Sequence, residues 1–88
     1  MMDWSIQTST RFDKAIRKLD RPMARRVLVA VYALAELDEP QRRCKALTGP
    51  LAGLWRLRIG DYRVILDIRR GELVLIALDL DHRSAIYE

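Results

Sequence analysis

The clearest hydrophobic pattern in the chain is an alternation of apolar and polar residues on both sides of the Gly-Asp pair at positions 60–61. Residues 55–68 read W-R-L-R-I-G-D-Y-R-V-I-L-D-I, and such a pair between two alternating runs is typical of a two-residue β-hairpin. Because glycine takes the first central position, the pattern predicts a type II′ turn. If the pair is the whole loop, the residues that face each other are Ile59 with Tyr62, Arg58 with Arg63, Leu57 with Val64 and Arg56 with Ile65.

This register gives the hairpin two chemically different faces. The apolar face is expected to join the core and carries Trp55, Leu57, Ile59, Tyr62, Val64 and Leu66. The other face carries three guanidinium groups, those of Arg56, Arg58 and Arg63. Like charges directly opposite on a sheet cost a few tenths to about 1 kcal/mol, so a bound polyanion would relieve the repulsion. The alternative is an ordinary solvated face with splayed side chains.

The chain before the hairpin predicts one strand and two helices. The alternation at 4–7 indicates a strand with Trp4 and Ile6 pointing inward. Three candidate N-caps at 8–10 come next, and a short amphipathic helix is predicted by the inner stripe Phe12, Ala15, Ile16 and Leu19. A second helix is predicted from a cap at Asp20 to about Leu37, with Pro22 in its first turn and the stripe Met23, Val27, Val31 and Leu34.

Residues 38–53 have no lasting period and contain two prolines and two glycines, which predicts a long ordered loop with one turn around 45–47. Three basic residues of this loop are expected to extend the charged face of the hairpin and to bind RNA: Arg42, Arg43 and Lys45. The alternative is a loop whose charges only improve solubility.

After the hairpin, a turn at 70–71 precedes the nearly continuous apolar run 72–78, which is typical of a central strand covered on both faces. Polar residues at 79–83 are expected to end this strand, and 84–87 to form a short final one. The order of elements predicts one α+β domain over residues 1–88, with two N-terminal helices on one face of a twisted, mainly antiparallel sheet of four to five strands.

Composition narrows the class of protein. Hydrophobic residues make up 50% of the 88 positions, enough for one small core. The net charge is +4 and the pI about 9.7, which favours nucleic acid or another acidic partner. The single Cys44 allows no internal disulfide, and without a Cys/His cluster we expect no metal site. No apolar run is long enough to cross a membrane, so we expect a cytoplasmic protein.

Two motifs found together are similar to a known family. R-x-R-x-G-D-Y-R covers the hairpin at 56–63, and H-R-x-x-x-Y follows at 82–87. With W-S-I and F-D-K-A-I-R-K-L-D near the start, the chain resembles the RelE/ParE superfamily of bacterial and archaeal toxins, most of all its RelE branch. The resemblance implies the toxin of a type II toxin–antitoxin module, held inactive by a cognate antitoxin. It also implies an mRNA endoribonuclease that needs no metal or cofactor, enters the ribosomal A site and inhibits translation.

In such enzymes the ribose 2′-hydroxyl attacks the adjacent phosphate. This reaction requires a proton acceptor, cations for the dianionic phosphorane and a proton donor for the leaving 5′-oxygen. The resemblance implies the catalytic candidates Arg56, Arg58, Arg63, His82, Arg83 and Tyr87. Guanidinium groups suit the phosphate, because they bind its oxygens bidentately and stay charged.

The general base is not assigned by the resemblance. Arg56 and Arg58 stand where several RelE relatives have lysines, and an arginine with a pKa above about 12 accepts a proton poorly. An imidazole is the side chain best suited to proton exchange at neutral pH, so His82 is a candidate for this work, or it is a plain strand-end residue. Tyr87 is a candidate for base stacking or proton donation, or an aromatic residue that pins the tail to the sheet.

Two other functions stay open, because a shared fold does not fix a function. One is a ParE-like toxin that inhibits DNA gyrase without cutting nucleic acid. The other is an RNA-binding member whose catalysis is weakened by the arginines in place of lysines.

Overall fold

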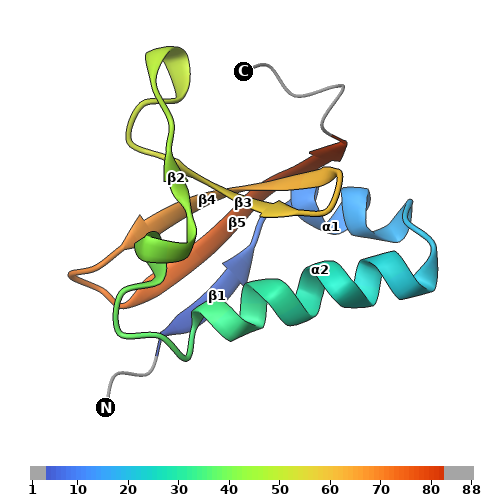
Figure 1. Cartoon of the computed structure of the whole chain (residues 1–88), viewed down its shortest axis with the longest axis horizontal. Coiled ribbons are helices and arrows are strands. Elements are labelled where there is room, and N and C mark those ends of the chain that lie inside the picture. The colour runs from blue at the N-terminus through green and yellow to red at the C-terminus, as the bar shows by residue number, and fades with distance from the viewer. Residues whose placement is uncertain (1–3, 83–88) are drawn as a thin grey trace.

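The computed structural model describes residues 4–82 and shows two helices packed on one face of a five-stranded sheet (Figure 1). The sheet order is β1-β5-β4-β3-β2, and every neighbouring pair is antiparallel except β1 with β5. This confirms the predicted α+β class. The elements in chain order are β1 (Ser5–Thr8), α1 (Thr10–Arg17), α2 (Arg21–Leu34), the 3-10 helix η1 (Pro40–Arg43), β2 (Lys45–Ala46), the 3-10 helix η2 (Gly49–Leu51), β3 (Trp55–Ile59), β4 (Tyr62–Arg69) and β5 (Val74–His82).

The hairpin of β3 and β4 has the predicted register. Ile59 pairs with Tyr62 and Arg58 with Arg63, and the pairing continues to Trp55 with Leu66. Gly60 has a φ of +59°, whereas Leu73 is the one non-glycine residue with a positive φ in the part of the chain that the structure describes. A positive φ at the first central position alone is the geometry of a type II′ turn, so the predicted turn type is confirmed.

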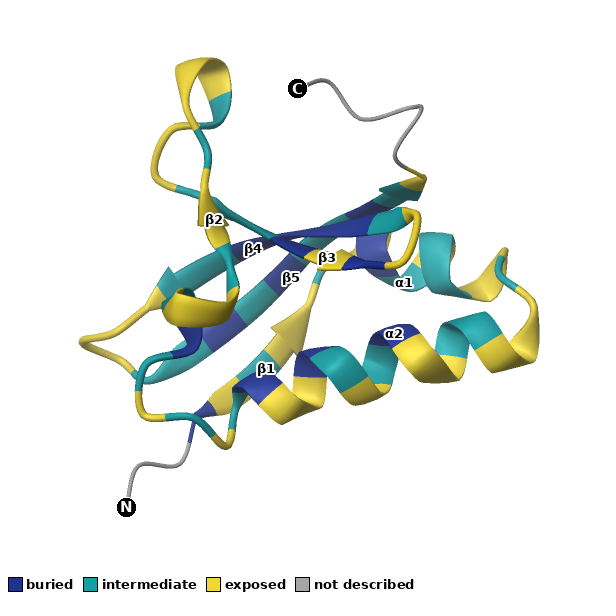
Figure 2. Ribbon diagram, in the orientation of Figure 1, coloured by how far each residue is buried: buried dark blue, intermediate teal, exposed yellow. Residues whose placement is uncertain are grey.

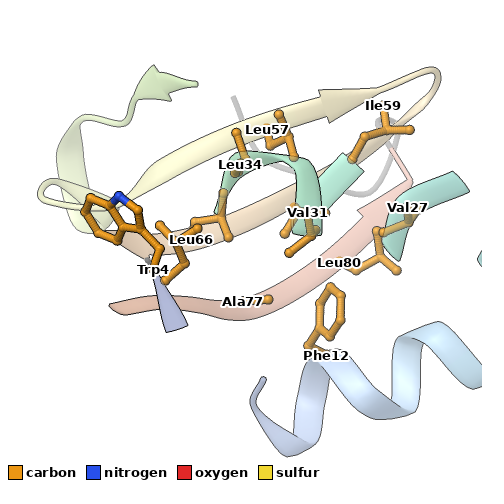
Figure 3. Close-up of a cluster of buried hydrophobic side chains, with 12 residues drawn as sticks. Trp4, Phe12, Val27, Val31, Leu34, Leu57, Ile59, Leu66, Ala77 and Leu80 are labelled. Carbon is orange, nitrogen blue, oxygen red and sulfur yellow. The ribbon is translucent and has the colours of Figure 1, made fainter. Parts of the chain in front are cut away.

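The core lies between the sheet and the two helices (Figure 3). Phe12 of α1 and the inner side of α2 meet the apolar face of the sheet, while the outer side of α2 is exposed (Figure 2). Trp4 closes one end of this core, and Trp55 and Tyr62 are partly buried against it. The buried side chains from helices and sheet are Phe12, Val27, Val31, Leu34, Leu57, Ile59, Val64, Leu66, Leu75, Ala77 and Leu80.

The prediction of a loop over residues 38–53 was wrong in part, because this segment contains the short edge strand β2 between two 3-10 helices. Lys45 pairs with Arg56 and Ala46 with Trp55, so β2 extends the sheet along the free edge of β3. A two-residue strand has no measurable period in the sequence. It forms because β3 offers unpaired backbone groups at its outer edge.

The predicted boundaries of α2 and β5 also need correction. Helix α2 ends at Leu34 rather than near Leu37, because the N–H groups of the next three residues bond to carbonyls three positions earlier, which tightens the last turn. Strand β5 continues through 79–82 instead of ending at Leu78. The final strand predicted at 84–87 lies outside the described residues.

A β-bulge allows β5 to continue. Val64 pairs with Leu80 and Leu66 with Ala77, so Leu78 is an extra residue on β5. The extra residue shifts the alternation by one position. As a result Leu80 joins the core, although simple alternation from Ala77 would have placed Asp79 there.

Ser9 connects the start of α1 to the sheet at this bulge through hydrogen bonds. Its hydroxyl donates to the carbonyl oxygen of Leu78 at 2.6 Å and accepts from the N–H of Phe12 at 3.0 Å. Its backbone N–H donates to the carbonyl of Ala77 at 2.9 Å. Ser9 therefore provides a hydrogen-bond acceptor for an N–H group in the first turn of α1 and a donor for a carbonyl group of the bulge.

Replacing Ser9 with alanine is expected to lower the free energy of unfolding by about 1 to 2 kcal/mol, because it removes both hydroxyl bonds. Urea denaturation followed by far-ultraviolet circular dichroism measures this change. The matched control is Ser5→Ala on exposed β1, which should stay within about 0.5 kcal/mol of the unmodified chain. Equal stability of the two variants would contradict the assigned role of Ser9.

Candidate functional site

Four cationic side chains gather around the hairpin on the sheet face that points away from the helices. Residues directly paired in an antiparallel sheet point to the same side, so Lys45 lies beside Arg56, and Arg58 beside Arg63. Because the intervening Leu57 enters the core, Arg56 and Arg58 project from the opposite side. We call this surface the basic face, and its members are Lys45, Arg56, Arg58 and Arg63.

The members of the basic face differ in burial. Lys45 and Arg58 are exposed, Arg56 is half-buried and Arg63 is only 7% exposed. Arg63 lies on β4, the middle strand of the sheet, and its Nε and Nη1 atoms are shielded from solvent. A buried guanidinium has few accessible rotamers, so Arg63 is held in a fixed orientation, whereas the exposed cations of this face can change theirs.

Asp81 of β5 is in register with Arg63, which places Arg63 between Arg58 and a carboxylate in one row across three strands. The neighbouring row runs from Lys45 through Arg56 and β4 to Asp79. Charge therefore changes sign across the sheet, from basic on β2 and β3 to acidic on β5. The acidic strand offsets part of the repulsion that the hairpin alone would suffer.

The register of these carboxylates with the arginines was not predicted from the sequence. The two carboxylates are fixed locally, because Oδ1 of Asp79 accepts from the N–H of Leu80 at 2.9 Å and Oδ1 of Asp81 from the N–H of His82 at 3.0 Å. Simple alternation from Ala77 would have placed both aspartates on the core face, so only the bulge reveals their register with the arginines.

The structure does not bring His82 together with the three arginines. His82 pairs with Tyr62, and their rings meet at 5.2 Å with an interplanar angle of 88°, so the imidazole lies on the helix side of the sheet. Arg63 follows Tyr62 directly and points to the other side. A part for His82 in proton transfer stays a prediction, and the candidates Arg83 and Tyr87 lie outside the described residues.

Of the three predicted RNA-binding residues in the loop, the structure places Lys45 on the basic face. Arg42 and Arg43 are exposed on η1, and Nε of Arg42 donates to Oε1 of Glu39 at 2.9 Å. An exposed ion pair of this kind is weak and easily exchanged. Arg42 and Arg43 therefore remain predictions as RNA-binding residues.

Cys44 has the environment of a structural residue. Burial raises the pKa of its thiol to about 11, and Sγ lies 3.6 Å from the carbonyl oxygen of Pro40. A thiol that stays protonated at neutral pH is a poor nucleophile. Residues 4–82 also contain no cluster of three or more metal-ligating side chains and no helix long and apolar enough to cross a membrane.

Comparison with known proteins gives a consistent result. Residues 6–87 match the family described as ParE toxin of type II toxin–antitoxin system, parDE. The chain is 34% identical over 82 residues to the toxin RelG of Mycobacterium tuberculosis, an alignment that covers 90% of this chain and 94% of RelG.

Two solved toxin–antitoxin complexes have similar chains. The RelBE2 complex of M. tuberculosis contains one with a TM-score of 0.72 and 31% identity, covering 96% of this chain and 95% of that one. The archaeal RelE–RelB complex of Pyrococcus horikoshii contains one with a TM-score of 0.75 and 30% identity, covering 97% of this chain and all of that one.

The crowding of cations on the basic face leads to a stability test. Arg58→Gln is expected to raise the free energy of unfolding in low salt by a few tenths to about 1 kcal/mol, because it relieves the repulsion with Arg63. The variant should also be stabilised less by added polyphosphate than the unmodified chain. Sodium chloride should reduce both the gain in unfolding free energy and the difference in polyphosphate stabilisation, because it screens the charges. Scanning calorimetry of Arg58→Gln beside the control Arg25→Gln on the outer side of α2 measures this, and identical changes in both variants would contradict a local effect.

Proposed function

The chain belongs to the RelE/ParE superfamily of type II toxin–antitoxin toxins, and from this membership we propose that it is a ribosome-dependent endoribonuclease that cleaves translated mRNA in the A site. The reaction is the attack of the ribose 2′-hydroxyl on the adjacent phosphate. It leaves a 2′,3′-cyclic phosphate and a 5′-hydroxyl, and the proposed place of action is the cytoplasm.

The observation that carries this proposal is the row in which buried Arg63 lies beside exposed Arg58. A substrate phosphate placed over this row meets one fixed and one adjustable guanidinium. The negative charge on its oxygens grows in the transition state, so donors fixed in advance stabilise the transition state more than the ground state. Arg63 is proposed as the main stabiliser of the phosphorane, with Arg56 and Arg58 holding the adjacent phosphates.

Lys45 supplies a chemical property that the arginines of this face lack. It is the one amine on the basic face in the part of the chain that is described, and it is in register with Arg56. An amine can exchange a proton, whereas a guanidinium with a pKa above about 12 does so poorly. This position supports a part for Lys45 in proton transfer as well as in RNA binding, alongside the candidates His82, Arg83 and Tyr87.

Inhibition of DNA gyrase is the second candidate function, because the matching family model is that of ParE toxins. An RNA-binding toxin with weakened catalysis is the third, since Arg56 and Arg58 are poor proton acceptors. Both alternatives use the same fold, and neither requires a buried arginine beside a scissile phosphate.

An antitoxin is the proposed protein partner, because the two similar chains described above come from toxin–antitoxin complexes. Two surfaces are suited to a small acidic protein. One is the basic face, and the other is the outer side of α2, where Val29 and Tyr32 are 61% and 57% exposed. Arg21 and Arg25 lie on the same side of α2, nearer its start. This combination of apolar and basic side chains favours an amphipathic helix of the partner that carries acidic residues.

Induced expression should produce new mRNA 5′ ends inside translated codons while DNA supercoiling stays intact. Primer extension maps these ends, and a supercoiling assay with purified gyrase tests the second function. A matched RNA that carries no ribosome-binding site serves as the control and should remain uncut. Inhibited gyrase with intact mRNA would contradict the proposed function, and so would ribosome binding without cleavage.

Arg63→Ala should lower the rate of cleavage on programmed ribosomes by about 10² to 10³, because a preorganised electrostatic stabiliser is lost. Arg63→Lys should recover part of that rate, since an ammonium group cannot reproduce the bidentate fork. Single-turnover cleavage is the measurement, with the thermal midpoint recorded for each variant.

Two further variants separate a loss of catalysis from a loss of folding. Arg63 is buried, so Arg63→Met retains most of the packing if alanine unfolds the domain. Arg69→Ala is the matched control, because Arg69 projects from the same side of β4 at its far end and pairs there with Asp67 and Glu72. Its cleavage rate should stay within about twofold. Full activity in a folded Arg63→Met chain would remove the basic face as the site of chemistry.

A further inference from the structure

A second concave surface lies on the helix side of the sheet, away from the basic face. It is a cleft of about 690 Å³ between α1 and the end of β5, which run close to each other in Figure 1. The proposed cleavage reaction uses no part of it apart from the prediction for His82. Its lining consists of Thr10, Arg11, Lys14, Ala15, Lys18, Leu19, Tyr62, Asp79, Leu80, Asp81 and His82.

One wall of this cleft is cationic. Arg11, Lys14 and Lys18 are spaced at i, i+3 and i+7, so they follow one side of α1, and all three are exposed. Arg11 is partly neutralised, because its Nη1 lies 3.8 Å from Oδ2 of Asp79. Arg17 belongs to the same helix but does not line the cleft. The rim therefore offers two lysines to an anion.

The opposite wall is aromatic and acidic. Tyr62 is half-buried and supports the exposed ring of His82 in a T-shaped contact, so the imidazole is held in place while it remains accessible. Asp79 and Asp81 also line the cleft, and Oδ2 of Asp79 reaches it beside Arg11. The carboxylate of Asp79 disfavours a second phosphate at this wall, but it accepts hydrogen bonds from the amino groups of bases.

From this combination we infer that the cleft binds one nucleotide of a single-stranded RNA, with the phosphate on Lys14 and Lys18 and the base against His82 and Tyr62. Unpaired bases are recognised by stacking on aromatic rings and by hydrogen bonds to their edges, while lysines bind the backbone. The carboxylate of Asp79 favours cytosine, adenine or guanine over uracil, since uracil has no exocyclic amine. The inference rests on the proposed function, because it assigns a further contact to the same RNA substrate.

The position of the cleft allows one continuous RNA chain to contact both the basic face and the cleft. Tyr62 and Arg63 are successive residues whose side chains point to opposite sides of the sheet, at the end where β4 begins. An RNA chain that crosses the Arg58–Arg63 row can therefore turn around this end of the sheet toward α1. The cleft is thus a binding site beside the Arg58–Arg63 row, where the proposed chemistry takes place.

Binding of a fluorescein-labelled 2′-O-methyl hexaribonucleotide to the full-length chain tests the inference. The methyl group blocks the attacking oxygen, so binding is measured without cleavage. Fluorescence anisotropy should show roughly tenfold weaker binding for the Lys14→Ala, Lys18→Ala double variant at about 0.1 M salt, and a salt slope smaller by about 0.7, because one phosphate contact is lost. Arg17→Ala, which removes a charge from α1 outside the cleft, should weaken binding less than about twofold.

A second arm tests the aromatic wall. His82→Ala should weaken binding about fivefold or more without changing the salt slope, while His82→Phe should retain the affinity because stacking needs only a flat ring. Cytidine, adenosine and guanosine monophosphates should compete better than uridine monophosphate, and all should compete better than inorganic phosphate. Circular dichroism confirms that each variant is folded.

Two results would overturn the inference: equal weakening by Arg17→Ala and the lysine variant, or competition by inorganic phosphate as strong as by nucleotides. These outcomes are separate from those of the proposed function. If the cleft variants bind RNA normally while Arg63→Met abolishes cleavage, the inference fails and the proposed function stands. If the cleft variants lose binding but the unmodified chain leaves mRNA on programmed ribosomes uncut, the inference stands and the proposed nuclease activity fails.

Discussion

The two-residue turn between β3 and β4 fixes the register on which the surface chemistry of this protein depends. Gly60 takes a positive φ that a residue with a Cβ adopts at a cost, and its turn allows Ile59 and Tyr62 to pair directly. In a sheet the side chains alternate with a period of two, so a slip of one residue would send Arg58 toward the core and Leu57 to solvent. Burial of the apolar set on one face therefore enforces the gathering of arginines on the other.

The bulge in β5 has the same importance on the acidic side of the site. By adding Leu78 to one strand, it turns Leu80 into the core and aligns Asp81 with Arg63. The hydroxyl of Ser9 holds this bulge against the start of α1. The bulge therefore determines that a carboxylate lies next to Arg63, and the residues after it form part of the wall of the cleft between α1 and β5.

Membership of a toxin superfamily explains why a small domain tolerates such a surface. Three arginines and a lysine on one sheet face work against folding, whereas a phosphate backbone or an acidic partner relieves their repulsion. The basic face is in this sense suited to a polyanionic partner. The exposed apolar side chains Val29 and Tyr32 on α2 form a different surface, which is suited to an amphipathic protein segment rather than to RNA.

The sequence by itself determined the hairpin, its turn type, both helices apart from the end of α2, and the core residues other than Leu80, because each depends on a local pattern that can be read along the chain. It also determined that Arg56, Arg58 and Arg63 share a face, since pairing across a two-residue turn is local. Only the tertiary structure placed Lys45 beside Arg56, Asp81 beside Arg63 and His82 on the other side of the sheet. A two-residue edge strand and a single bulge leave no period in the sequence, and their positions follow from backbone pairing between segments distant in the chain.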